Sequence, residues 1–231
     1  MSKKSEKQYY DKFATKWDSQ FVSKAGQNFR NRKLTFLNEY LKDVKGVVLD
    51  VGCATGYFTS RIVNKNLKMI GVDMSEGMVE YARKKYPNLN FVVCKIQELS
   101  SKFKDVDCIF MLGVFSDKNS RAALCECSKV LKRNGKLIIG VGNGDNFYLK
   151  FIHNLFHRID PARSITLNQL EIQLKEYKFV LTKRKIFHLV PYYIPDFLFS
   201  FVKALESRIE KTFFIRSLGS IIGIEAVKNN E

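Results

Sequence analysis

The sequence has no uninterrupted apolar run of about 18 residues, the length that a helix needs to cross a bilayer. Its first residues, MSKKSEKQYYDKF, are rich in lysine and lack the apolar core of a secretory signal peptide. We therefore expect a protein that is made and kept in the cytoplasm. With 231 residues, the chain can bury one sizeable core, so we expect a single domain over residues 1–231.

Cysteine and histidine are scarce. The five cysteines form no CxxC pair, and reduced cysteines pack like small apolar side chains. Two of the three histidines, His153 and His157, stand one helical turn apart. Their segment HNLFH lacks the acid of an HExxH metal motif, and no third ligand is evident. We expect neither a disulfide nor a metal site.

Acidic residues are also few compared with basic ones. The sequence has 39 Lys and Arg residues and 23 Asp and Glu residues, which gives a formal net charge of +16. The sequence has no long basic block, although the first 33 residues are the densest in positive charge. Short runs such as Lys183–Lys185 are typical of solvated faces. The alternative is an anionic partner, either RNA or a membrane surface with anionic lipids.

The run VVLDVGCATGYFT, residues 47–59, passes from an apolar strand into a loop of small residues. Nearly continuous Val and Leu predict a parallel strand buried on both faces. Gly52 and Gly56 then allow the backbone to bend and approach a ligand closely. A dinucleotide fingerprint would read GxGxxG, whereas this loop reads GxAxG and continues with Tyr57.

The loop resembles motif I of the Rossmann-like methyltransferases that use S-adenosylmethionine (SAM), which is a strand, an acid and then GxGxG. Asp50 stands at the acid position, and Ala54 replaces the middle glycine. The resemblance implies that Asp50 anchors the methionine end of SAM, directly or through water. The loop residues that it places at the cofactor are Gly52, Cys53, Ala54 and Gly56.

A second acid, Asp73, ends the short apolar strand KMIGV and follows Asp50 by 23 residues. An acid at this strand tip is placed to accept hydrogen bonds from ribose hydroxyls. Ser75 is a plausible N-cap for a helix over residues 76–85. The string GVDMSEGMVEYARKK is similar to the post-I motif of the same family. By that resemblance Asp73 holds the ribose and Met74 packs on the adenine.

Further strand candidates alternate with helical or loop segments downstream. They are Leu89–Cys94, Asp105–Leu112 and Val130–Val141, with a turn at Asn134-Gly135. The alternation predicts an α/β fold with a doubly wound, mostly parallel sheet and a ligand crevice at the carboxyl ends of its strands. The resemblance implies seven strands with helices on both faces and an antiparallel last strand, Ile221–Val227.

The sequence departs from the family after the third of these strands, where an acid commonly meets the adenine amino group. Lys95 follows Cys94 here, and a lysine side chain cannot accept a hydrogen bond. Either Gln97 or Glu98 supplies the acceptor, or backbone groups near Ile96 recognise the adenine alone.

Residues 1–44 are expected to form a helical cap. Aromatic residues recur every four positions and give one aromatic helix face: Tyr9, Phe13, Trp17 and Phe21. The string YYDKFATKWD resembles the entry segment of the ubiquinone- and menaquinone-type methyltransferases, which folds over bound SAM. By that resemblance Tyr10 and Arg32 reach the methionine end of SAM, with Arg30 as the alternative to Arg32. Packing of this helix over the sheet is the simpler interpretation.

After a SAM-binding core over residues 45–144, residues 145–231 form a C-terminal part. The expected elements are helices over Asp145–His157 and Leu167–Tyr177, the second capped by Thr166 or Ser164, and an extended segment Phe179–Leu189. A helical insert is expected over residues 190–220, with Pro195 in its first turn. Four roles are open for this aromatic-rich insert: it covers an apolar substrate as a lid, contacts a membrane, forms a dimer surface, or packs on the core of its own domain.

The strand tip MLGVF has neither the [DN]PPY motif of amino-directed DNA methyltransferases nor the cysteine of cytosine-C5 enzymes. The resemblance places Leu112 and Gly113 near the reacting centre. The sequence identifies no general base. Candidate proton acceptors are His153, His157, Tyr192 and Tyr193.

Together these patterns predict a SAM-dependent methyltransferase acting on oxygen or nitrogen of a small or amphipathic metabolite, which is quinone-like, lipid-linked or glycan-related. The basic charge favours an RNA methyltransferase as the alternative. A third hypothesis is a non-catalytic SAM-binding protein, because the adenine acid is missing. The sequence does not indicate an oligomeric state.

Overall fold

The computed structural model describes residues 3–146, 164–187, 194–209 and 219–229. Its centre is a mostly parallel eight-stranded sheet in the order β3-β2-β1-β4-β5-β8-β7, with β6 paired to the end of β5. The strands are β1 Gly46–Val51, β2 Leu67–Asp73, β3 Asn90–Val93, β4 Val106–Leu112, β5 Leu131–Asn143, β6 Ser164–Ile165, β7 Phe179–Phe187 and β8 Ile221–Lys228.

The first two helices of the described residues, over residues 3–21, form what we call the N-terminal arm. Most of the other helices pack on the sheet. The helices are α1 Lys3–Phe13, η1 Ala14–Phe21 (a 3₁₀ helix), α2 Lys24–Leu41, α3 Glu76–Lys85, η2 Ile96–Glu98, α4 Leu99–Lys102, α5 Ser120–Val130, α7 Leu167–Glu176 and α8 Asp196–Ile209. None of the helices in the described ranges is long and apolar enough to span a bilayer.

The predicted α/β fold is confirmed, including the antiparallel last strand. Strand β8 runs antiparallel to both β5 and β7, and the other strand pairs of the described residues are parallel. The topology reverses between β1 and β4, since the chain first builds outward through β2 and β3. Such a switch point opens a crevice at the carboxyl ends of the strands.

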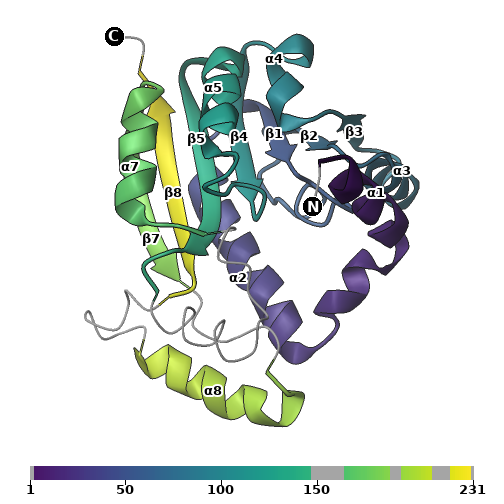
Figure 1. Cartoon of the computed structure of the whole chain (residues 1–231). Helices are drawn as coiled ribbons and strands as arrows, with labels where there is room; N and C mark the ends of the chain where they lie inside the picture. Colours follow the sequence, from purple (N-terminus) through teal and green to yellow (C-terminus); the bar gives the residue numbers. More distant parts are fainter. Residues whose placement is uncertain (1–2, 147–163, 188–193, 210–218, 230–231) are drawn as a thin grey trace.

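Two apolar layers hold the helices to opposite faces of the sheet. In β4, Ile109 and Met111 pack in the cluster that includes α5 and α7, whereas Cys108 and Phe110 pack in the cluster that includes α2. This alternation follows from the two-residue repeat of a strand. Figure 1 shows α5 and α7 in front of the sheet and α2 behind it.

Local capping signals correctly predicted two helices. The Ser75 side chain accepts a hydrogen bond from the Met78 amide and caps α3. Thr166 and Gln169 form a reciprocal capping box at the start of α7. Both side chains satisfy backbone N–H groups that the first helical turn leaves without a partner.

Two local expectations were wrong in detail. The aromatic N-terminal helix is an α-helix only to Phe13 and continues as the 3₁₀ helix η1. The turn at Asn134-Gly135 lies within the bounds of β5, where Asn134 has φ +60° and the pairing with β4 shifts register.

The C-terminal half follows the predicted order where it is described. Strands β7 and β8 and helix α7 lie where they were expected, and α8 begins directly after Pro195. Helix α8 lies below the carboxyl edge of the sheet in Figure 1, beside α2. The candidates His153, His157, Tyr192 and Tyr193, and most of the helix expected over 145–157, lie outside the described residues.

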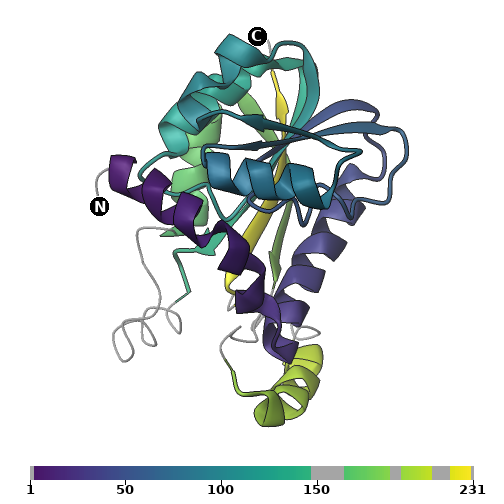
Figure 2. The same cartoon turned by 90° about the vertical axis from the view of Figure 1, so that its right-hand side faces the viewer.

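The N-terminal arm spans the open end of the crevice. Helix α1 contacts α3, and η1 contacts both α3 and α2. Figures 1 and 2 show the arm descending from α3 to the lower end of α2. The arm therefore covers the crevice on the side of β1 and β2.

Candidate functional site

The loop after β1 adopts backbone conformations that favour glycine. Gly52 and Gly56 have φ of +81° and +77°, and Ala54 has φ +47°. A Cβ on Gly52 would lie 2.1 Å from Cγ1 of Val114, so even alanine does not fit there without displacement. Ala54 tolerates its left-handed conformation at a cost of about 1 kcal/mol. The loop is thus a strained, close-fitting turn.

Asp73 at the tip of β2 holds this loop in place. One carboxylate oxygen accepts a hydrogen bond from the Ala54 amide and the other from the Ser75 amide, both at 2.9 Å. Burial raises the pKa of Asp73, while these amide bonds oppose the rise. Each carboxylate oxygen has a second lone pair. Asp73 therefore retains acceptor capacity beside the loop.

Asp50 at the end of β1 is 2% exposed. Its Oδ2 accepts a hydrogen bond of 2.6 Å from the Thr59 hydroxyl. Burial raises the pKa of Asp50 to about 7, which the Thr59 bond opposes and the nearby Asp73 charge reinforces. A cation beside Asp50 would favour the charged carboxylate.

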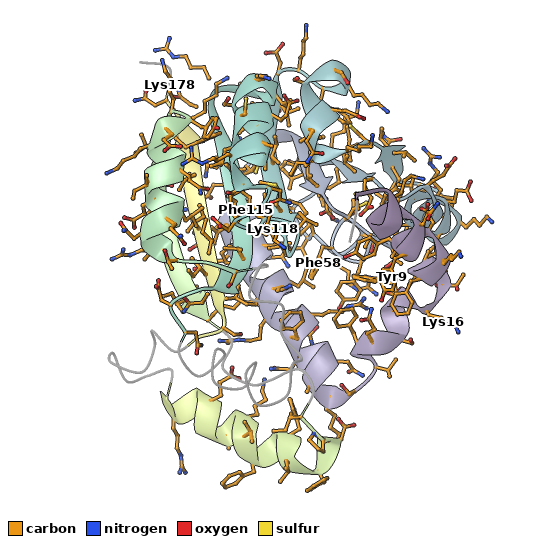
Figure 3. All side chains as sticks on the ribbon, in the orientation of Figure 1. Tyr9, Lys16, Phe58, Phe115, Lys118 and Lys178 are labelled. Atoms are coloured by element: carbon orange, nitrogen blue, oxygen red, sulfur yellow. The ribbon has the colours of Figure 1, made fainter. Side chains whose placement is uncertain are left out.

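A cavity of about 80 Å³ lies over the loop. Its lining residues come from the arm, α2, the loop and the tip of β4: Trp17, Phe21, Phe29, Arg30, Lys33, Asp50, Gly52, Cys53, Ala54, Thr55, Tyr57, Phe58 and Leu112. Figure 3 shows Phe58 between the sheet and the arm, with Tyr9 further out on α1. Five of the thirteen lining residues are aromatic, and charged side chains from α2 and β1 also reach the cavity.

Asp18 in η1 joins three elements around this cavity. It accepts hydrogen bonds from Arg30 of α2 at 2.6 Å, from Lys85 of α3 at 2.7 Å and from the hydroxyl of Thr55 in the loop at 3.0 Å. Burial raises the pKa of Asp18, but the bonds from Lys85 and Arg30 and the Arg30 charge outweigh it and leave the pKa lowered. The Asp18 carboxylate thus ties the arm to the loop.

Arg30 is enclosed by aromatic rings. Its guanidinium carbon lies 3.9 Å from the ring centre of Phe21 and 4.2 Å from that of Tyr57. Such stacking adds to the ion pair with Asp18. The guanidinium of Arg30 therefore forms part of the cavity wall, and its charge is balanced by Asp18.

Asp11 docks α1 onto the first turn of α3. Its Oδ1 accepts hydrogen bonds from the Ser75 hydroxyl at 2.6 Å and from the Gly77 amide at 3.1 Å. A Cβ on Gly77 would lie 2.6 Å from the Asp11 carbonyl oxygen, so the contact needs a glycine. The negative charge also suits the positive end of the α3 dipole.

Most of the predicted SAM residues lie at or beside this cavity. The predicted loop residues Gly52, Cys53 and Ala54 line the cavity, as does Leu112. Gly56 does not line it but directly follows the lining residues of the loop. Tyr10 packs against the Trp17 ring, 5.8 Å between centroids. Arg32 lies on α2 but does not line the cavity, unlike its alternative Arg30. Contact of each with SAM stays a prediction.

The adenine side is less well defined. Met74 is partly buried directly after Asp73, and Ile96 and Gln97 lie in η2, with Gln97 exposed. Glu98 forms an exposed ion pair with Lys95 at 3.0 Å. In this arrangement Glu98 is engaged, so Gln97 or the backbone near Ile96 is the better-placed acceptor.

Four polar residues around this site were not predicted: Asp11, Asp18, Lys33 and Thr55. Asp11, Asp18 and Thr55 bind groups that lie far along the chain, as Asp18 and Lys85 do. The only available signal was their position within segments already assigned to the cofactor. No local motif pairs an acid in the arm with a threonine in the loop.

A larger hollow of about 590 Å³ lies at the end of α3, lined by Ser60, Arg61, Lys85, Tyr86, Pro87, Asn88 and Leu89. It is lined by none of the strand-tip residues of the cavity over the loop. Within the described residues, no three His, Cys, Asp or Glu side chains are placed to hold a metal ion.

The chemical groups around the loop suit the parts of a SAM molecule. Asp73 has acceptor capacity for ribose hydroxyls, and Asp50 suits the ammonium group. The loop glycines let the backbone pack closely, since a Cβ on Gly52 would clash with Val114 and one on Gly56 with Phe91. Aromatic rings offer an apolar wall for the remainder of the molecule.

Comparison with known proteins agrees with this assignment. Residues 48–135 match the family described as "Methyltransferase domain". A malonyl-[acyl-carrier protein] O-methyltransferase of Priestia megaterium is 28% identical over 198 residues, covering 75% of this chain and 68% of the relative. A ubiquinone/menaquinone biosynthesis C-methyltransferase of Campylobacter jejuni is 29% identical over 106 residues, covering 42% and 44%.

Among solved structures, the fold is similar to that of magnesium protoporphyrin IX methyltransferase from Synechocystis with bound S-adenosylhomocysteine (SAH). The TM-score is 0.69 at 17% identity, covering 99% of this chain and 100% of that one. The methyltransferase-domain match over residues 48–135 and the similarity of the fold to a SAH-bound methyltransferase both indicate SAM as the cofactor. The chain spans 40%, 47% and 63% of the first three curated relatives that it matches.

Proposed function

We propose that the protein transfers the methyl group of SAM to an oxygen or nitrogen atom of a small or amphipathic metabolite. The observation that carries this proposal is the pair of acids, Asp50 and Asp73, on a glycine loop beneath an aromatic wall. SAM brings the reactive methyl group on a positively charged sulfur. The protein therefore has to bind, align and exclude water.

Each part of the site has a role in that task. Asp73 accepts hydrogen bonds from the ribose while its amide partners hold the loop. Asp50 accepts from the ammonium group, whose charge favours the ionised carboxylate. The arm, tied down by Asp18 and Asp11, keeps water from the reacting atoms.

The choice of a small or amphipathic acceptor rests on apolar surface near the carboxyl edge of the sheet. The cavity wall is aromatic, and α8 exposes 82% of Phe197 and 73% of Phe201 at the same end of the molecule. A quinone-like, lipid-linked or glycan-related acceptor suits such surroundings, and α8 suits peripheral contact with a membrane. The two relatives described above are named for a malonyl-carrier and a quinone-pathway reaction, and the second acts on carbon.

The net charge of +16 favours one further candidate, an RNA methyltransferase. RNA binding of that origin would weaken steeply as salt rises. A chain that binds SAM but transfers no methyl group would instead be a non-catalytic SAM-binding protein.

Incubating the protein with a cell extract and isotope-labelled SAM tests the proposal directly. Mass spectrometry of the separated small-molecule, lipid and RNA fractions should show label in a small or lipid-like product. The Asp73→Ala variant should lose that product, and Glu76→Ala, which changes an exposed acid on α3, should keep it. Label in RNA alone would support the RNA candidate, and no label from a SAM-binding protein would contradict catalysis.

A further inference from the structure

Lys33 is a buried lysine at the centre of the site. It lies on α2 with 9% of its surface exposed and lines the cavity together with Asp50 and Gly52. Its ammonium nitrogen would lie 3.7 Å from a Cβ on Gly113, the residue directly after β4. Lys33 therefore reaches across the cavity from α2 to the tip of the fourth strand.

The carboxylates near Lys33 are bound to other groups and do not balance its positive charge. Arg30, one helical turn away, is itself bound by Asp18, and Asp50 is bound by Thr59. In the described part of the chain no carboxylate forms an ion pair with Lys33, whose Nζ lies 4.1 Å from the Phe29 ring centre. The other titratable groups on the cavity wall are Cys53 and Tyr57.

This environment favours the neutral amine. Burial, with the Arg30 charge as a second cause, lowers the pKa of Lys33 to about 8. Near pH 8 about half of the molecules would carry a free lone pair on Nζ. A buried lysine of this kind is suited to accept a proton.

The position of Lys33 matches the place where methyl transfer would occur. Asp73 on the β2 side would hold the ribose, and SAM would carry its sulfur on the 5′ carbon of that ribose. The methyl group would then extend toward the β4 side of the topological switch. The nitrogen of Lys33 lies near Gly113 at the tip of β4, in the same cavity as the loop.

We propose that Lys33 is the general base of this site, an inference that rests on the proposed function. Nζ takes the proton from the hydroxyl or amine of the acceptor as the acceptor atom bonds to the methyl carbon. The bond from that carbon to sulfur breaks, and its electron pair stays on sulfur, which leaves SAH. Lys33 then returns the proton to water.

In a competing role, Lys33 would bind the carboxylate of the cofactor. The two roles can be distinguished by how the charge of the bound ligand changes the pKa of Lys33. SAM and SAH share the carboxylate, but only SAM carries a positive sulfur. A lysine beside the reacting sulfur loses its proton more readily in the SAM complex. A carboxylate clamp holds its proton more firmly in both complexes alike.

Lysine-selective carbon NMR of the full chain tests this inference. The pKa of Lys33 would be measured in the free protein, with SAH and with SAM, with the Lys33→Arg spectrum used for assignment. We expect a value below the ordinary lysine range, and lower with SAM than with SAH by about half a pH unit or more. Lys24, exposed on the same helix, should not respond.

The outcomes separate the possible failures. If neither ligand binds wild type, the proposed function fails together with this inference. If both bind and the Lys33 pKa is ordinary, or rises equally with SAM and SAH, only the general base is overturned. Once an acceptor is known, Lys33→Met should lower kcat about a hundredfold and remove its rise with pH, while KM for SAM and the Lys24→Met control stay near wild type.

Discussion

At the residue scale, Asp50 is a carboxyl group that the fold removes from solvent before any ligand arrives. Within the described residues, the side chain that donates a hydrogen bond to Asp50 is that of Thr59, a neutral donor. A charged carboxylate in such a place is unfavourable. The free protein therefore stores an electrostatic cost at the point where the cofactor's positive end is expected.

That cost predicts a pH dependence of stability. Because the pKa of folded Asp50 is raised from 3.8 to about 7, its contribution to the free energy of unfolding is present below pH 4 and lost as pH rises through 7. Asp50→Asn should remove this loss. Between pH 4 and pH 8, urea unfolding should show the variant gaining about 3 kcal/mol relative to wild type. A constant difference across that range would contradict the buried carboxylate.

Local residue signals explain why much of the fold was predictable. Ser75 and Thr166 mark helix starts through contacts only three residues away, and strand β1 is recognised by its uninterrupted apolar run. The loop's left-handed conformations were signalled by Gly52 and Gly56. Interactions within a few residues depend little on the rest of the chain.

At the scale of elements, the N-terminal arm is held by two acids rather than by a large apolar contact with the sheet. Asp18 links η1 to α2, the loop and α3, and Asp11 links α1 to α3. Removing such a partner leaves several donors unsatisfied. The arm should therefore loosen before the sheet does.

Asp18→Asn tests that order of events. It removes the negative charge from Arg30 and Lys85, so the free energy of unfolding should fall by about 2 kcal/mol at pH 7. Because the folded pKa of Asp18 is lowered, the difference should disappear as pH falls below its ordinary value of 3.8. Hydrogen exchange should accelerate in residues 14–21.

Asp43→Asn is the matched control, since its ion pair with Lys42 is exposed on both sides. It should change neither stability nor exchange appreciably. Unchanged exchange of residues 14–21 in Asp18→Asn would show that other contacts hold the arm.

The same element explains what sequence analysis missed. The aromatic spacing correctly indicated a helical arm, but it did not show that the helix tightens to 3₁₀ after Phe13. That change of period places Asp18 over Thr55, a contact across 37 positions in the chain. Only the packed structure brings Asp18 to Arg30, Thr55 and Lys85, because no local preference selects such pairs.

At the scale of the whole molecule, the parts of the site meet at one end. In Figure 1 the carboxyl edge of the sheet faces α8 below it, and the N-terminal arm descends on the right from α3 to the lower end of α2. The predicted cofactor residues occupy the β1 and β2 side, while the exposed Phe197 and Phe201 belong to α8, which packs beside α2. This layout suits a bound cofactor on one side and an apolar acceptor arriving from the other.

The most direct test of this account is isothermal titration of the full chain with SAM. Wild type should bind, and the double variant Asp73→Ala with Gly52→Val should lose at least about a hundredfold in affinity. The variant would lose the two hydrogen bonds proposed between Asp73 and the ribose, and the new side chain at position 52 would clash with Val114. Glu76→Ala should bind like wild type. No binding by folded wild type, or undiminished binding by the double variant, would contradict the SAM site described here.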